Sequence, residues 1–153
     1  MKISRTIVVL AGWALLVAMV PAFAQNTWNG SSLNVKFNAP MAFYVGDKQM
    51  PAGDYEVTQA AGYQANTLLV RGAGKNEAYA EFTPIGSPKP LDKMDVTFNK
   101  YGDKEYLNSI NYPGIDAGSG SWILQLNPSA GEQAAAKAAT AAKHTVPAGG
   151  NKK

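Results

Sequence analysis

The stretch "MAFYVGDKQMPAGDYEV", Met41 to Val57, contains two alternating apolar segments separated by two turn signatures. In "MAFYV" and again in "YEV", large apolar residues occupy every second position. A period of two is typical of β-strands that bury one face. Between the two segments, "VGDK" and "PAGDY" supply the Gly, Pro and Asp residues that reverse turns use. The stretch therefore predicts strands joined through tight turns.

The two aspartates of this stretch have two alternative interpretations. Asp47 and Asp54 could bind a metal ion, or they could belong to the turns themselves. Pro51 presets φ, Gly53 can adopt a positive φ, and an Asp side chain can bond to nearby backbone. We therefore prefer the turn interpretation. The residues that carry this signature, including its recurrence in "YGDK", are Gly46, Asp47, Pro51, Gly53, Asp54, Gly102 and Asp103.

The same alternation continues along the chain. Runs of turn-forming residues separate the apolar segments at spacings near ten residues, which is typical of antiparallel sheets. No helical period occurs before Ser129. The sequence therefore predicts an all-β domain, an antiparallel β-sandwich or small barrel of about eight strands. The expected strand segments are "LNVKF", "MAFYV", "YEV", "TLLVR", "EAYAEF", "MDVTF", "EYLNSINY" and "SWILQL".

The first 24 residues have the pattern of a secretory signal peptide. Lys2 and Arg5 form a positive region, "TIVVLAGWALLVAMV" is apolar, and "PAFA" supplies small residues before a cleavage point after Ala24. The alternative is a membrane anchor, but the apolar run is short for a span of about 20 residues. We therefore expect an exported protein, periplasmic or extracellular, with no membrane span after cleavage. It has no cysteine, so no disulfide can stabilise it.

The C-terminal part changes in composition. Ser129 and Glu132 have the spacing of a capping box, and an Ala-rich run follows them. This pattern predicts a short helix and then a disordered "HTVPAGGNKK" tail. The predicted organisation is a signal peptide at 1–24, a β-domain at 25–128, and an Ala/Lys-rich helix with a flexible tail at 129–153.

The distribution of charge argues against nucleic acid as a partner. Residues 25–128, which exclude the two basic residues of the signal peptide and the four lysines and Glu132 of the C-terminal part, contain eight basic residues against ten acidic ones. Nucleic-acid binding requires Lys and Arg clustered on one face. The predicted β-domain has a single Arg, Arg71, and is mildly acidic.

Several catalytic classes do not fit the predicted β-domain. The single histidine, His144, lies in the predicted tail, so a Ser–His–Asp triad, a Cys–His pair and a His-based zinc site are excluded. "GAGK" at 72–75 predicts a hairpin tip, because the rest of a phosphate-binding loop is missing. We expect no catalytic residue, no metal and no cofactor. The carboxylate pairs that could serve acid/base or calcium chemistry, and that we interpret as solvated strand edges, are Asp47 with Asp54, Asp92 with Asp95, and Asp103 with Glu105.

Tyrosines that fall out of phase with the core pattern, or lie near turns, form the candidate binding surface. They are Tyr44, Tyr79, Tyr101 and Tyr112. An exposed Tyr offers both an apolar ring and a polar hydroxyl to a partner. The alternative interpretation is that these rings cover a sheet edge or close a barrel end.

Four segments in this order also resemble a known pattern: "FNAPMAFYVGDKQMPAGDYEV", "TLLVRG", "VTFNKYGDKEYLNSI" and "LNPSAGEQ". They are similar to a family of small exported proteins of acidobacteria and relatives, with its "VGDK-x-LPAG-x-Y" and "RYGD-x-YFL" motifs. The chain departs from that pattern at Ala39, where Val is common, at Glu105, and in its longer Ala-rich tail. The resemblance implies export and a β-rich fold. It implies no activity, ligand or catalytic residue.

Together these observations predict an exported, non-enzymatic β-domain that acts as a binding or envelope-associated module, with a protein or envelope component as its partner. Two alternatives remain open. A lipocalin-like barrel would carry an apolar small molecule and would need small inward side chains that leave a cavity. A carboxylate-based hydrolase would need two carboxylates that converge in one cleft.

Overall fold

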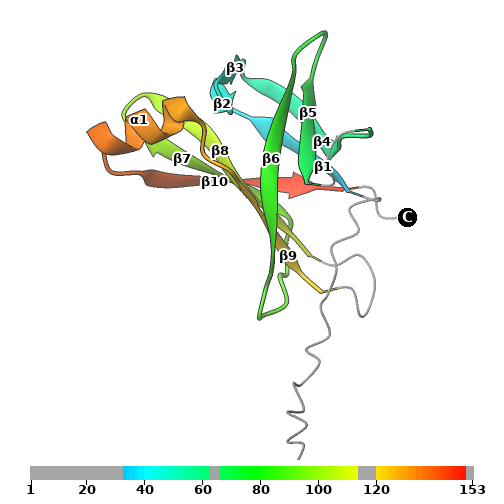
Figure 1. The fold of residues 1–153 in the computed structure, drawn as a ribbon. Coiled ribbons are helices and arrows are strands. Elements are labelled where there is room, and N and C mark those ends of the chain that lie inside the picture. The colour runs from blue at the N-terminus through cyan, green and yellow to red at the C-terminus, as the bar shows by residue number, and fades with distance from the viewer. Residues whose placement is uncertain (1–32, 63–65, 114–119, 151–153) are drawn as a thin grey trace, which may run out of the picture.

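The computed structural model describes residues 33–62, 66–113 and 120–150 (Figure 1). The predicted signal peptide at 1–24 lies outside these described residues. Within them the chain forms ten strands and one helix. In order they are β1 (Asn34–Ala39), β2 (Phe43–Val45), β3 (Lys48–Met50), β4 (Gly53–Gln59), β5 (Thr67–Gly72), β6 (Glu77–Gly86), β7 (Asp95–Tyr101), β8 (Lys104–Tyr112), β9 (Trp122–Leu126), α1 (Ala130–Ala138) and β10 (Ala142–Gly149).

Eight of the strands form a closed antiparallel barrel. Their order around the wall is β8, β7, β10, β1, β4, β5, β6 and β9, and β9 then pairs with β8. Closure satisfies the backbone groups at both edges of the sheet. The predicted all-β class is therefore confirmed, and of the two predicted architectures the barrel is the one that forms.

The hairpin of β2 and β3 lies outside this ring and fills one end of the barrel (Figure 1). β2 runs parallel to β8, with Tyr44 opposite Tyr106. Lys48 Nζ donates a hydrogen bond to the Glu77 carbonyl oxygen at 2.6 Å, which ties the hairpin to β6. The alternating pattern in "MAFYV" thus correctly predicted a strand, but this strand belongs to a plug rather than to the barrel wall.

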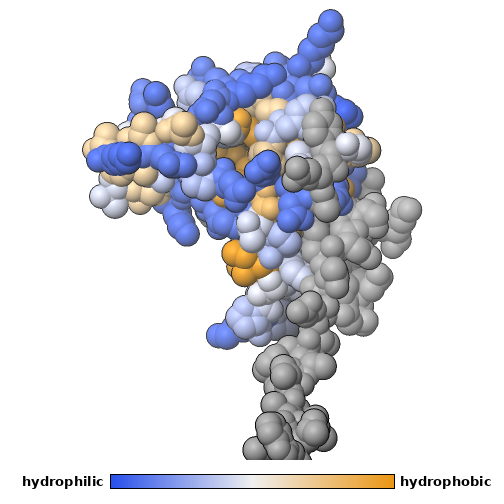
Figure 2. All heavy atoms as spheres, in the orientation of Figure 1, coloured by the Kyte–Doolittle hydropathy of each residue, from blue (hydrophilic) through white to orange (hydrophobic). Residues whose placement is uncertain are grey.

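Aromatic rings from four strands fill the barrel at this end. The Phe43 ring lies 5.3 Å from the Phe98 ring and 4.9 Å from the Tyr55 ring, in both cases edge to face. The Phe37 ring stacks on the Tyr55 ring at 5.6 Å. Phe43 and Phe98 are fully buried. The barrel centre is therefore a packed core, and the surface around it is largely hydrophilic (Figure 2).

The predicted turn glycines have the positive φ angles that the sequence pattern requires. φ is +60° at Gly46, +149° at Gly53 and +64° at Gly102, a region that residues with a Cβ avoid. "GAGK" is a hairpin tip between β5 and β6, as predicted, with Gly74 at φ +70°. The Tyr55 hydroxyl donates to the Pro51 carbonyl oxygen at 2.6 Å and closes the "PAGDY" turn.

The two turn aspartates bond to more distant partners than the turn interpretation predicted. Asp54 Oδ1 accepts from Asn38 Nδ2 on β1 at 2.8 Å. Asp47 Oδ1 accepts from the backbone N–H of Gly131 at 3.0 Å. Gly131 lies in the first turn of α1, where backbone N–H groups lack intrahelical partners. Asp47 therefore links the β2–β3 turn to the C-terminal helix.

The prediction of a disordered tail is wrong for residues 142–149. This segment is β10, which pairs with β7 over six residues and with β1 at Lys36 and Phe37. It is a wall strand of the barrel, so the predicted boundary at 128 does not separate the β-domain from the C-terminal part. The apolar signal is weak because Val146 is the single large apolar residue of the strand, and His144 takes another inward position.

The predicted helix forms, and its capping box is half formed. Ser129 Oγ accepts from the backbone N–H of Glu132 at 3.2 Å, as the spacing predicted. The Glu132 carboxylate contacts Asn99 on β7 instead of returning to the cap. Within the described ranges, no helix has the length and apolar character needed to cross a membrane.

Candidate functional site

A cleft of about 200 Å³ lies between α1 and the outer face of β7, β8 and β9. Val96 and Phe98 of β7 point into the core, so the alternating position Asn99 faces outward, where α1 covers it. Figure 1 shows the helix beside the same end of the barrel that the β2–β3 hairpin fills. The polar side chains that line the cleft are Asn99, Tyr101, Asn108, Gln125, Glu132 and Gln133.

Glu132 is the charged group of this cleft, and it is 6% exposed. Its Oε1 accepts from Asn99 Nδ2 at 2.9 Å. Because it occupies the first turn of α1, the positive end of the helix dipole stabilises its negative charge. In the part of the chain that the structure describes, no Lys, Arg or His side chain forms an ion pair with it.

Tyr101 lies next to this carboxylate. Burial raises the pKa of its phenol, the nearby charge of Glu132 raises it further, and a hydrogen bond with Asn99 opposes these two effects. The phenol is therefore protonated at neutral pH. It offers one donor and the lone pairs of its oxygen to a ligand.

Two glutamine side chains complete the cleft wall. Gln125 Nε2 donates to the Asn108 carbonyl oxygen at 3.1 Å, and Gln133 Nε2 donates to the Pro128 carbonyl oxygen at 3.1 Å. Each of these bonds uses one of the two N–H donors of the amide, so each side chain keeps its second N–H and its carbonyl oxygen for other contacts. Together with the Glu132 carboxylate, these carbonyl oxygens give the cleft several hydrogen-bond acceptors.

Of the four predicted tyrosines, Tyr101 lines this cleft, and Tyr44 is connected to Tyr101 through the ring of Tyr106. The Tyr44 ring stacks on the Tyr106 ring at 5.0 Å, and the Tyr101 ring meets the Tyr106 ring edge to face at 6.0 Å. Lys104 Nζ lies 6.0 Å from the centre of the Tyr44 ring. Tyr106 is buried between the other two, so the three rings support the cleft rather than form a broad exposed patch.

The other two predicted tyrosines lie elsewhere. Tyr112 is 5% exposed and belongs to the core cluster on β8. Tyr79 is 43% exposed on β6, opposite Leu69 of β5. The four tyrosines therefore do not make one continuous binding surface.

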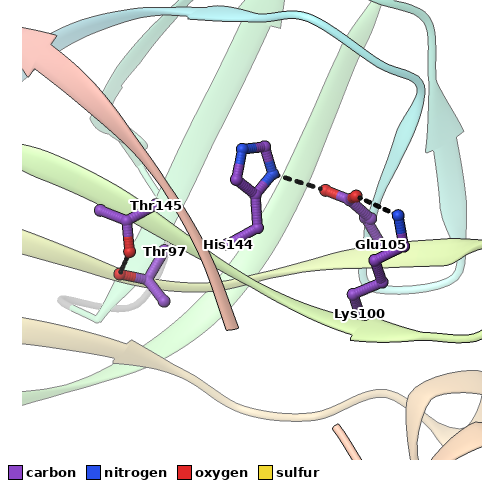
Figure 3. Close-up of polar contacts among 5 residues, drawn as sticks. All are labelled: Thr97, Lys100, Glu105, His144 and Thr145. Atoms are coloured by element: carbon purple, nitrogen blue, oxygen red, sulfur yellow. Dashed lines mark hydrogen bonds and ion pairs between the residues drawn. The ribbon is translucent and has the colours of Figure 1, made fainter. Parts of the chain in front are cut away.

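The buried Glu105 carboxylate and the partly exposed His144 ring form a second polar cluster, on the inner side of the barrel wall (Figure 3). Glu105 Oε2 lies 3.1 Å from His144 Nδ1, and Glu105 Oε1 lies 3.4 Å from Lys100 Nζ. The prediction that His144 belongs to a tail was wrong, because β10 places it opposite Phe98. These contacts connect β10 to β7 and β8. Among the described residues, no three His, Cys, Asp or Glu side chains are grouped as metal ligands.

A wider groove of about 560 Å³ crosses β1, β4 and β5 on the opposite part of the barrel. Its charges are already paired with one another: Lys36 Nζ lies 4.0 Å from Glu56 Oε1, and Arg71 Nε lies 3.7 Å from Glu77 Oε2. All these groups are substantially exposed, where such pairs contribute little. This groove is therefore a weaker candidate than the cleft beside α1.

The carboxylates that the sequence paired do not converge. Asp95 Oδ1 accepts from Asn111 Nδ2 at 2.8 Å on the neighbouring strand, and Asp103 lies exposed in the β7–β8 turn. The partners of Asp47, Asp54 and Glu105 are those described above. Asp54, Asp95 and Glu105 thus connect neighbouring strands, and Asp47 connects a turn to the helix.

The sequence patterns did not identify the amide side chains as parts of a binding site, and they identified Glu132 as a helix-capping residue alone. Asn99, Asn108 and Gln125 occupy outward positions in three neighbouring strands, β7, β8 and β9. Polar amides at outward strand positions are the sequence feature that could have indicated a polar site on this face of the sheet. Their convergence depends on the docking of α1, which no local pattern reveals.

Comparison with family models, with curated proteins and with solved structures gives no match for this chain. The resemblance to the exported family of acidobacteria and relatives stays a prediction that rests on the quoted motifs alone.

Proposed function

We propose that the protein is an exported, non-enzymatic β-barrel binding module that holds its ligand in the cleft between α1 and the barrel. The observation that carries the proposal is the desolvated Glu132 carboxylate beside Tyr101, in a cleft lined by oriented amide groups. Concave sites with a few convergent polar groups are typical of ligand binding. We further propose that the ligand belongs to an envelope component, in keeping with the predicted export signal.

The packed barrel centre supports an outer site over an inner one. A lipocalin-like carrier keeps space inside its barrel for an apolar molecule. Here the rings of Phe37, Phe43, Tyr55 and Phe98 occupy that space. We therefore favour binding at the outer cleft over carriage of an apolar molecule in the interior.

The composition of the cleft supports binding over catalysis. Hydrolysis by paired carboxylates needs two acids that face each other across the substrate. Glu132 is the one carboxylate among the described residues of the cleft, and Tyr101 retains its proton because its pKa is raised. The Glu105 and His144 pair lies on the inner side of the wall, away from this cleft.

Photo-crosslinking tests the location of the binding site. A benzophenone amino acid replaces Ala136, an exposed residue that lines the cleft, or Lys75, an exposed control in the β5–β6 turn. We expect the mature protein to form an adduct with an envelope component from position 136 and not from position 75. The adduct should disappear when Tyr101→Ala is added. Equal labelling from both positions, or labelling that survives Tyr101→Ala, would contradict the proposal.

A further inference from the structure

Two buried carboxylates in this protein have opposite electrostatic environments. Glu105 is 4% exposed, and its carboxylate lies 3.4 Å from the Lys100 ammonium and 3.1 Å from the His144 ring. Glu132 is 6% exposed, and in the described part of the chain its side-chain partner is the neutral amide of Asn99. Buried carboxylates are normally compensated by a cation or by several donors. Among residues 33–62, 66–113 and 120–150, Glu132 is thus a buried carboxylate without a cationic partner.

The surroundings of Glu132 are suited to a donor rather than to an acceptor. The amide nitrogens of Gln125 and Gln133 each use one N–H on a backbone carbonyl oxygen, and the side-chain carbonyl oxygens of both residues are acceptors in the cleft lining. An ammonium group has three N–H donors and no acceptor. It could therefore bond to the carboxylate and to neighbouring oxygens together. An anionic group would be repelled by Glu132.

The size of the cleft limits the ligand. Pockets for drug-sized molecules have volumes of about 300–1,000 Å³. At about 200 Å³, this cleft takes a smaller group, such as an ammonium on a short alkyl chain. The Tyr101 ring and the methyl group of Ala136 offer apolar contact to that chain.

We infer that the cleft between α1 and the barrel binds a primary alkylammonium group, with its charge on the Glu132 carboxylate. The inference rests on the proposed function, because it assigns a ligand chemistry to the same cleft. A free amine and a lysine side chain present the same chemistry, and the test below separates these two sources.

Calorimetric titration of the full mature chain tests the inference. The probes are n-butylammonium, Nα-acetyl-lysine methylamide, the neutral methyl α-glucoside and the anion butyrate. Both ammonium probes should bind, and butyrate should not. Glu132→Gln keeps the shape of the side chain but removes its charge, and it should weaken ammonium binding on the order of 10- to 100-fold. Glu81→Gln, an exposed acid on β6, should leave binding unchanged.

The probe panel on the wild-type chain keeps the test independent of how the variant folds. Equal affinity of n-butylammonium for wild type and Glu132→Gln would overturn the inference, and so would butyrate binding as well as n-butylammonium. If methyl α-glucoside binds and neither ammonium probe does, the inferred ligand chemistry is wrong, but the proposal that the cleft is a binding site stands. If no probe binds and Ala136 crosslinks nothing, both proposals fail. Tighter binding of the lysine derivative supports a side-chain source, and tighter binding of n-butylammonium supports a free amine.

Discussion

Deletion of residues 142–153 is expected to abolish the folding of the barrel. The deletion removes β10, which separates β7 from β1 in the wall. It would leave two unpaired strand edges and expose the core beside Phe98, which packs against His144 at 6.2 Å between ring centres. Open edges also promote association between chains. Circular dichroism and thermal unfolding should show loss of the cooperative transition.

A shorter deletion provides the control for this experiment. Removal of 151–153 leaves β10 intact and should leave the unfolding midpoint unchanged. A chain without residues 142–153 that unfolds cooperatively at the wild-type midpoint would show that the segment is a dispensable tail, and the barrel described above would be wrong.

Phe43→Ala is expected to be the most damaging single substitution in the plug. Phe43 is fully buried and contacts the rings of Phe37, Tyr55 and Phe98. Truncation of a buried Phe to Ala costs about 3–5 kcal/mol of unfolding free energy, a large part of the roughly 5–15 kcal/mol that stabilises a typical domain. Urea denaturation measures the loss. Ile85→Ala, at a side chain that is 45% exposed, should cost about 1 kcal/mol or less.

The same variant distinguishes a packed barrel from a carrier. Where Phe43→Ala still folds, the cavity that it creates should allow an apolar fluorescent dye to bind, whereas the wild-type protein should not bind it. A wild-type protein that binds the dye as tightly as the variant would favour the lipocalin-like alternative.

Local patterns predicted most of the fold because each strand carries its own alternation and each turn its own glycine. Seven of the eight predicted segments correspond to strands of the barrel wall, and "MAFYV" corresponds to β2 of the plug. β10 was missed because its stability comes from its neighbours rather than from its own residues. A polar strand with a Pro and a single buried Val is held by the pairing of both edges and by the contact of His144 with Glu105.

The candidate site was predicted less well, because its parts meet across long sequence separations. Of the four tyrosines selected from the sequence, Tyr101 lines the cleft beside α1, and the role of all four in binding stays a prediction. Glu132 has a complete local explanation as a capping residue, yet its carboxylate bonds to Asn99, 33 positions away. Asp47 likewise has a local explanation as a turn residue, yet it bonds to Gly131, 84 positions away. A local role that satisfies a motif can conceal a tertiary one.

Titration of ¹⁵N,¹³C-labelled mature protein with n-butylammonium, followed by nuclear magnetic resonance, distinguishes binding in the cleft beside α1 from binding inside the barrel. We expect the side-chain amide signals of Asn99 and Gln133 to move with saturation, while the methyl signals of Val96 and Ile110 in the core stay in place. Shifts confined to the core methyl groups, with the cleft amides unmoved, would contradict the proposed binding in the cleft.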